Sequence, residues 1–353
     1  MASCILYQIS ESTIILIDVP RSIEIAQGTA ARKLLSSKPL ESPFPSVEPK
    51  SEKARANLGE ISLDGLLVQK HIQLSLDQLK SEWKDKWCLP RQVKCEVEGC
   101  ENERAGRGTK RKKGEREHQD TITQISTEES NGLDSNGRPS VRIPPYSTVL
   151  IGDITSTSHI FLSHAPKFNL IVLDPPWPNR SARRKKSYGI SYGNHEIRTL
   201  LSSIPLTNYL AEDAFVGIWV TNKLAFREMV LGGNGLFEEW GVHLVEEWIW
   251  LKVTSSGEPI SELSSMWRKP YEIFLVGKKG VSSDEDVKRR VLVGVPDLHS
   301  RKPNLKTVFE RVMKKEKYEA LEVFARNLTA GWWAWGNEVL KFQSEEYWIE
   351  DEH

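Results

Sequence analysis

The stretch Asn169-Leu170-Ile171-Val172-Leu173-Asp174-Pro175-Pro176-Trp177 decides the fold class of this chain. An apolar run of this kind is typical of a strand that is covered on both faces, as in a parallel sheet. Open α/β sheets bind ligands beyond the carboxyl ends of their strands, and Asp174 lies at such an end. The two prolines restrict the backbone, so the acceptors of Asp174 and Pro175 point in defined directions. With Trp177 as a stacking surface, they predict a site for a planar ring with an exocyclic amine.

Outward from this stretch, short apolar runs alternate with helical patterns. Strands are expected at 170–173, 215–220, 245–251, 273–276, 292–295 and 321–324. Helices are expected at 222–230 and at 304–315, where Asn304 is a candidate cap. This alternation predicts an α/β domain with a largely parallel sheet over residues 142–353.

The first part of the chain has a different pattern. Residues 5–7 and 14–17 predict a hairpin, and apolar spacing predicts a helix within 63–87. Apolar residues nearly vanish from 101 to 140, where a basic run includes Arg107, Lys110, Arg111, Lys112 and Lys113. We therefore predict a smaller mixed α+β domain at 1–98 and a disordered linker at 99–141. The basic run fits a solvated tether, with nuclear targeting or RNA contact as the alternatives.

Composition narrows the function classes. The 48 basic and 48 acidic side chains balance, which excludes a globally basic DNA-coating protein. Without a long apolar run or a secretory signal pattern, we expect no membrane span and an intracellular protein. Four cysteines in 353 residues do not predict a disulfide framework. Cys88, Cys95, Cys100 and His118 are poorly spaced for zinc, so no metal site is predicted. Dinucleotide, Walker and zinc-peptidase motifs are missing from the sequence.

Several segments together resemble one known family. They are Asp174-Pro-Pro-Trp-Pro-Asn-Arg-Ser181, Ile218-Trp-Val-Thr-Asn222, Glu247-Trp-Ile-Trp-Leu-Lys252, Ser300-Arg-Lys302-Pro303, Phe324-Ala-Arg326-Asn327 and Trp335-Gly-Asn337-Glu338. Over residues 151–340 the chain resembles the Asp-Pro-Pro-Trp family of S-adenosylmethionine-dependent adenine N6-methyltransferases, in its methyltransferase-like protein four branch. The resemblance implies a Rossmann-like domain with a permuted motif order, because the catalytic motif precedes the strand that usually opens such a domain.

The resemblance also implies roles for individual residues. In the catalytic motif Asp174-Pro175-Pro176-Trp177, adenine N6 would donate hydrogen bonds to the Asp174 side chain and the Pro175 carbonyl, while Trp177 stacks on the base. Asp174 would also border the cofactor, S-adenosylmethionine. The other implied cofactor contacts are Asp153 and Ile154 at its adenine, Lys302 at its carboxylate, Arg326 and Asn327 at its ribose, and Asn337 and Glu338 nearby. Glu338 departs from a glutamine in a better-known branch.

A basic and aromatic loop follows the motif. It contains Arg180, Arg183, Arg184, Lys185, Lys186, Tyr188 and Tyr192. Phosphate contacts and stacking predict that this loop binds nucleic acid, with a merely solvated loop as the alternative. The resemblance favours RNA adenosine, including 2′-O-methyladenosine of a small nuclear RNA, and leaves DNA adenine or a non-catalytic binding subunit open. We expect a nuclear protein, with the cytoplasm as the alternative. The sequence does not decide between a monomer and a heterodimer.

Overall fold

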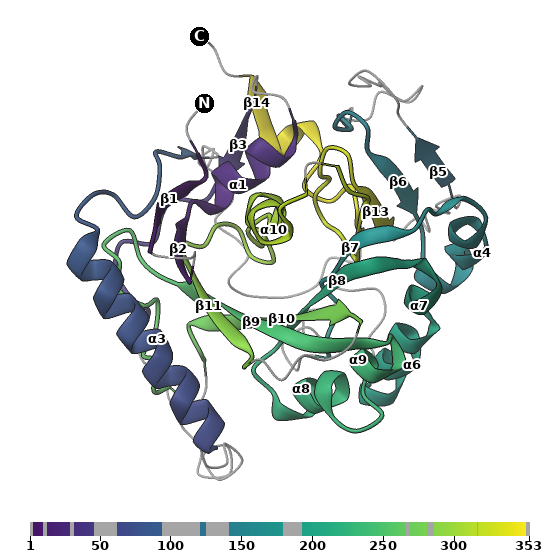
Figure 1. Cartoon of the computed structure of the whole chain (residues 1–353). Coiled ribbons are helices and arrows are strands. Elements are labelled where there is room, and N and C mark those ends of the chain that lie inside the picture. The colour runs from purple at the N-terminus through teal and green to yellow at the C-terminus, as the bar shows by residue number, and fades with distance from the viewer. Residues whose placement is uncertain are drawn as a thin grey trace, which may run out of the picture.

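The computed structural model describes residues 3–9, 13–28, 32–45, 62–93, 121–124, 141–178, 193–265, 268–280, 286–315 and 317–350 (Figure 1). Its main feature is an 11-stranded sheet with the order β1-β2-β11-β9-β10-β8-β7-β12-β13-β6-β5. The strands are β1 Ile5–Gln8, β2 Ile14–Ile17, β5 Thr121–Gln124, β6 Thr148–Ile151, β7 Phe168–Leu173, β8 Leu210–Val220, β9 Val242–Lys252, β10 Tyr271–Lys279, β11 Lys288–Gly294, β12 Ala320–Val323 and β13 Trp333–Gly336. The strands predicted from the apolar runs are confirmed, most of them with longer bounds.

The centre of the sheet is parallel. Strands β6, β13, β12, β7 and β8 run in one direction, so their carboxyl ends share one edge. Strand β10 runs antiparallel to both β8 and β9, and therefore begins at that same edge. The sheet is mixed, as part of a mixed α/β fold. The predicted hairpin is also confirmed, because β1 pairs antiparallel with β2.

Helices cover both faces of the sheet (Figure 1). One face carries α4 Ile154–His164, α6 Asn194–Ser203, α7 Leu206–Tyr209, α8 Leu224–Leu231 and α9 Leu236–Glu239, whose apolar residues share a core with β7, β8, β12 and β13. The other face carries α1 Val19–Ala26 and α10 Lys306–Met313. Helix α10 begins two residues after the predicted Asn304, whose side-chain oxygen accepts the Lys306 N–H at 2.9 Å.

The N-terminal residues extend the central sheet. Strand β2 pairs parallel with β11, and α3 (Leu63–Glu82) packs on β2, β9 and β11 in a shared core. We predicted a smaller mixed α+β domain at residues 1–98, and this division of the chain stays a prediction. The described apolar residues of this part are buried against strands far along the chain, such as β9 and β11. Sequence periodicity predicts that a residue is buried, but it does not identify the residues that cover it.

Two further findings concern the chain ends and the predicted linker. Strand β3 (Arg32–Ser36) pairs antiparallel with β14 (Trp348–Glu350), which follows the short helix η2 (Glu345–Tyr347), and also pairs with β4 (Gln92–Val93). The predicted disordered linker contains β5, which pairs antiparallel with β6. Three of the four residues of Thr121–Gln124 are β-branched, a type that favours strands, although the neighbouring sequence is polar. Residues 94–120 and 125–140 lie outside the described part.

Candidate active site

The candidate site lies where β7 and β12 end side by side, with Leu173 opposite Val323. After β7 the chain continues to β8, which lies on the side of β7 away from β12. After β12 it continues to β13, which lies on the side of β12 away from β7. Such a reversal of strand order is where open α/β sheets bind ligands. Asp174 follows β7 directly, and its N–H donates to the Val323 carbonyl at 3.3 Å. The sequence prediction that Asp174 lies at a carboxyl strand end is therefore confirmed.

Two cations hold the Asp174 carboxylate. Arg326 Nη1 lies 3.2 Å from one oxygen, and Lys302 Nζ lies 3.6 Å from the other. The Asp174 side chain is only 13% exposed, so these charges act through a partly dehydrated environment. Three residues predicted from separate segments of the sequence thus converge on one carboxylate.

Lys302 also binds a carboxylate that the sequence analysis missed. Its Nζ lies 2.5 Å from Glu272 at the start of β10, and Lys252 at the end of β9 binds the other Glu272 oxygen. Burial alone would raise the pKa of Glu272, but Lys302 and Lys252 outweigh it and hold that pKa well below its usual range. Burial acts to lower the pKa of Lys302, yet Asp174 and Glu272 outweigh it and raise that pKa. Both side chains therefore keep their charges.

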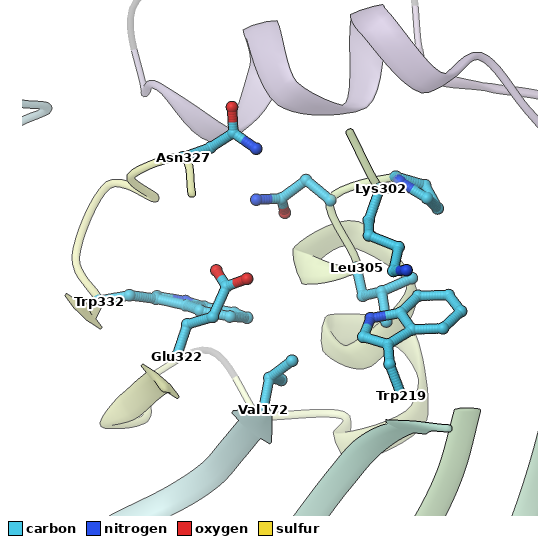
Figure 2. A pocket seen from close by; sticks show the side chains of 9 residues that line it. Val172, Trp219, Lys302, Leu305, Glu322, Asn327 and Trp332 are labelled. Atoms are coloured by element: carbon cyan, nitrogen blue, oxygen red, sulfur yellow. The ribbon is translucent and has the colours of Figure 1, made fainter. Parts of the chain in front are cut away.

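A small pocket with a volume of about 30 Å³ adjoins these charges. Figure 2 shows its main side chains, with the Lys302 amine over the Trp219 indole and Glu322 pointing inward. The lining residues are Val172, Trp219, Lys302, Pro303, Asn304, Leu305, Glu322, Asn327 and Trp332. Burial, together with the charge of Asp174, raises the pKa of Glu322 to about 8 while Arg326 opposes the rise. A cationic side chain and a carboxyl group thus share one small space.

Asn327 supplies an unused acceptor in the same cavity. Its Oδ1 atom is buried and has no hydrogen-bond partner among the described residues. A buried acceptor without a donor is costly, and a ligand can supply the missing donor. A small molecule that carries both an ammonium and a carboxylate fits this donor and acceptor set. The amino-acid end of S-adenosylmethionine is such a group.

The other predicted cofactor residues lie along the same edge of the sheet. Arg326 Nε bonds Glu338 at 3.1 Å, and Asn337 is exposed beside it. The preceding Gly336 carbonyl accepts the Gly152 N–H at 3.2 Å, which places the start of α4 next to this turn. Asp153 caps α4, because its side chain accepts the Thr155 N–H at 2.9 Å. The Ile154 side chain is core, so its backbone is the part left for a ligand.

The catalytic motif has a tightly held backbone and a fixed indole ring. The Pro175 carbonyl accepts the Trp177 N–H at 2.8 Å, and Trp177 Nε1 donates to the Trp219 carbonyl at 2.6 Å. The Trp177 ring packs against Phe226 at a centroid distance of 4.7 Å. One part of the ring therefore belongs to the core. Pro176 is half-buried in the same turn.

Backbone strain marks the same region. Phe324 after β12 has φ 63°, and Ser300 before Lys302 has φ 70°, both in the left-handed region that ordinary residues avoid. Strained residues of this kind concentrate at functional sites. Sequence reasoning missed both, together with Glu272, Glu322 and Trp219. A carboxylate inside the buried strand ALEV was the one available signal for Glu322.

Other predicted site residues lie outside the described part of the chain. They are Arg180, Arg183, Arg184, Lys185, Lys186, Tyr188 and Tyr192 of the basic loop. Cys95, Cys100 and His118, for which no metal site was predicted, also lie outside the described part. The described residues include no group of three side chains that could hold a metal ion. Among the helices that the structure describes, none is long and apolar enough to cross a membrane.

Comparison with known proteins places this site in a family. The MT-A70 family model matches residues 168–338, which include the catalytic motif, Lys302 and Arg326. A protein of Cryphonectria parasitica named N6-methyladenosine RNA methyltransferase MTA1 is 40% identical over 363 residues, covering 99% of this chain and 95% of that protein. The chain belongs to the MT-A70 family.

Two further MT-A70 relatives have names that differ in the substrate. Human N(6)-adenine-specific methyltransferase METTL4 is 36% identical over 219 residues. The match covers 59% of this chain and 44% of the human protein. A Caenorhabditis elegans protein named DNA N6-methyl methyltransferase is 31% identical and covers 58% of this chain and 54% of that protein. The names of these relatives therefore include one that states RNA and one that states DNA.

Proposed function

We propose that this protein is an S-adenosylmethionine-dependent adenine N6-methyltransferase of nucleic acid, with RNA adenosine as its favoured substrate. The observation that carries the proposal is the Asp174 carboxylate at the switch point between β7 and β12, held by Arg326 and Lys302 within the MT-A70 segment. The fungal relative that matches nearly the full chain is named for RNA, which supports RNA over DNA.

The catalytic residues suit an exocyclic amine. The two Asp174 oxygens have more acceptor sites than their cations occupy, and the Pro175 carbonyl has a second lone pair beside the one used by Trp177. The adenine amine would donate to both acceptors, which orients its lone pair away from them. Because that lone pair is delocalised into the ring, positioning and electrostatic preorganisation contribute more than a strong base. Trp177 would stack on the base and exclude water.

The edge of the sheet offers a continuous set of cofactor contacts. S-adenosylmethionine, when bound, supplies an electrophilic methyl group on a sulfonium. Lys302 would hold its carboxylate. Glu322 and the acceptor of Asn327 would face its ammonium, in place of the ribose contact that the sequence implied for Asn327. The proposed contacts at the other end are Arg326, Asn337 and Glu338 at the ribose and Asp153 with the Ile154 backbone at the adenine.

Several finer points belong to the same proposal. The catalytic motif precedes β12, and this order agrees with a permuted methyltransferase domain. Residues 1–98 would act as a subdomain that is built onto the sheet. The basic loop with Arg180, Arg183, Arg184, Lys185 and Lys186 would bind phosphates, with Tyr188 and Tyr192 stacking on bases. Adenosine with a 2′-O-methyl group in a small nuclear RNA and a nuclear location are the proposed setting.

One experiment tests the reaction and the polymer together. The protein and S-adenosylmethionine are incubated separately with RNA and with DNA, and the digested nucleosides are measured by mass spectrometry. We expect N6-methyladenosine from RNA, and none from the Asp174→Ala variant. Product from DNA alone would replace RNA by the DNA alternative. Binding of nucleic acid with no product on either polymer, and no calorimetric binding of the cofactor, would favour the non-catalytic subunit.

A further inference from the structure

The segment between β11 and α10 sends two neighbouring cations in opposite directions. Lys302 points to Asp174 and Glu272 in the site, whereas Arg301 is 2% exposed and points into the protein. Arg301 Nη1 lies 2.5 Å from Asp297 Oδ2 and donates to the Leu35 carbonyl at 3.0 Å. Both side chains of the Arg301–Asp297 pair are fully buried.

Residues far from Arg301 in the sequence complete its surroundings. The guanidinium carbon lies 4.7 Å from the centre of the Phe342 ring and 5.5 Å from that of Tyr347, so aromatic faces cover the charge. Asp297 also accepts the Ser37 N–H at 2.7 Å. The N-terminal strand β3 and the segment before β14 thus hold one buried ion pair from two sides.

A second arginine fixes the start of the same segment. Arg91 donates to the carbonyls of Val295 at 2.8 Å and Pro296 at 2.9 Å. The backbone from 295 to 302 is therefore anchored at both ends by buried guanidinium groups. Between them, Ser300 keeps its left-handed φ of 70°, and its carbonyl accepts from Arg326 at 3.4 Å. Strain of this kind persists only where surrounding contacts determine the backbone.

We infer that Arg301 is a positioning residue for the cofactor site, which sets the direction of the adjacent Lys302 by fixing the backbone next to the strained Ser300. This inference rests on the proposed function, because Lys302 is its proposed contact with the cofactor carboxylate. Asp297 and the Leu35 carbonyl both bond Arg301 Nη1, so a lysine amine could meet them, but a lysine would lose the flat guanidinium that lies against the Phe342 and Tyr347 rings.

The test compares two buried arginines. Arg301→Lys changes the anchor, and Arg290→Lys changes a matched pair on β11, where Arg290 binds Glu246 with side-chain exposures of 7% and 11%. Arg290 lies four residues before the carboxyl end of β11. Its partner in this ion pair, Glu246, is not one of the proposed cofactor contacts. For wild type and both variants, calorimetry gives the Kd for S-adenosylmethionine, thermal unfolding gives Tm, and steady-state kinetics give KM and kcat.

We expect both variants to lose a similar amount of Tm, but only Arg301→Lys to weaken cofactor binding. A small displacement of the Lys302 amine from the cofactor carboxylate is costly. For Arg301→Lys, the Kd and the KM for S-adenosylmethionine should therefore rise about tenfold, with a smaller change in kcat. Arg290→Lys should keep the wild-type Kd within about twofold, as sites without shared partners act independently. Equal Kd values for wild type and Arg301→Lys would overturn the inference.

A milder variant keeps the test decisive if Arg301→Lys does not fold. Tyr347→Leu removes one half-buried ring from the buried guanidinium, and we expect a smaller rise in Kd, about threefold, with wild-type kcat. An unchanged Kd in folded Tyr347→Leu would then contradict the inference. Failure of the wild-type protein itself to bind S-adenosylmethionine would instead refute the proposed function, and the positioning role with it.

Discussion

Asp174 and Glu247 are both largely buried carboxylates between two cations, and they lie on the same sheet. Asp174 is 3.2 Å from Arg326 and 3.6 Å from Lys302, while Glu247 is 2.9 Å from Arg227 and 3.3 Å from Arg289. Their backbones differ. Glu247 lies inside β9 with paired strands on both sides, whereas Asp174 follows the end of β7 at the switch point.

The surroundings of the two carboxylates differ as well. The Asp174 cluster adjoins a cavity, two residues with strained φ angles, and the Asn327 acceptor, which has no partner among the described residues. Glu247 is bound within regular strand pairing. The comparison teaches that a buried ion pair alone is weak evidence for function. A position beyond a strand end, strained backbone and an unused buried acceptor together indicate a site for a ligand.

The largest expected effect separates the two carboxylates directly. Asp174→Asn should lower kcat for adenine methylation at least about 100-fold, because one of the preorganised acceptors is lost. The matched Glu247→Gln change should reduce Tm and leave kcat close to wild type. Steady-state assays at saturating cofactor, with circular dichroism as a check of folding, measure both. If Glu247→Gln lost as much activity as Asp174→Asn, the distinction drawn between the two clusters would fail.

The next effect concerns the pH dependence of stability near the cavity. Folded Glu322 has a pKa of about 8, against 4.5 for an ordinary glutamate. Between these values the folded state holds a proton that the unfolded chain has lost, so the Glu322 contribution to stability is full below pH 4.5 and disappears as pH rises to 8. Burial is the main cause of the raised pKa of Glu322, the charge of Asp174 raises it further, and Arg326 lowers it.

Replacing Glu322 should remove this pH dependence. Glu322→Gln should gain on the order of 2 kcal/mol of unfolding free energy relative to wild type between pH 5 and pH 8. Urea denaturation of both proteins at the two pH values measures the difference. The Glu247→Gln protein serves as the control for a buried carboxylate inside a strand. A gain that is the same at both pH values would mean that Glu322 titrates normally.

A smaller effect is expected at Asn327. Because its buried Oδ1 has no partner among the described residues, Asn327→Ala should change the unfolding free energy by less than about 1 kcal/mol. The same change should raise the Kd for S-adenosylmethionine about fivefold, since a hydrogen bond to a charged group is lost. Thermal unfolding and calorimetry on the same samples compare the two. Lost stability with an unchanged Kd would show that Asn327 is only structural.

The smallest effect is expected at the outer end of the Glu247 cluster. Asp64 at the start of α3 is 54% exposed and lies 3.2 Å from Arg289. Exposed ion pairs contribute little, so Asp64→Asn should cost less than about 1 kcal/mol. Its kcat and cofactor Kd should equal those of the wild type. A clear loss of cofactor affinity would mean that the two clusters are coupled through the sheet.

Local patterns predicted much of this structure. Asp174 was found because a buried strand, two prolines and a tryptophan follow one another directly in the sequence. Asp174, Lys302 and Arg326 come from segments that resemble family motifs, and the structure brings them together. The β1–β2 hairpin was also predictable, since a pair of neighbouring strands needs only local information.

The missed features depend on distant parts of the chain. Glu272 and Lys302 form an ion pair although they are 30 residues apart in the sequence. The apolar pattern of β10 predicts a strand, but it does not predict the pairing with β9 or the contact with Lys302. The same holds for β2, whose neighbour Leu292 on β11 decides that the N-terminal hairpin joins the main sheet. Backbone strain at Ser300 and Phe324 was not predictable either, because neither residue type favours a positive φ.

The pairing of β3 with β14 has a consequence for synthesis of the protein on the ribosome. The edge of β3 that pairs with β14 stays uncovered until residues 348–350 have been synthesised. In the same way, the edge of β2 that pairs with β11 stays uncovered until β11 has been synthesised. Such long-range closure makes folding slow and leaves strand edges open to aggregation in the nascent chain. Since Phe342 and Tyr347 cover Arg301, the segment that carries Lys302 also gains this support only after residue 347 has been synthesised. Chains that stop before residue 340 should therefore depend on chaperones to remain soluble.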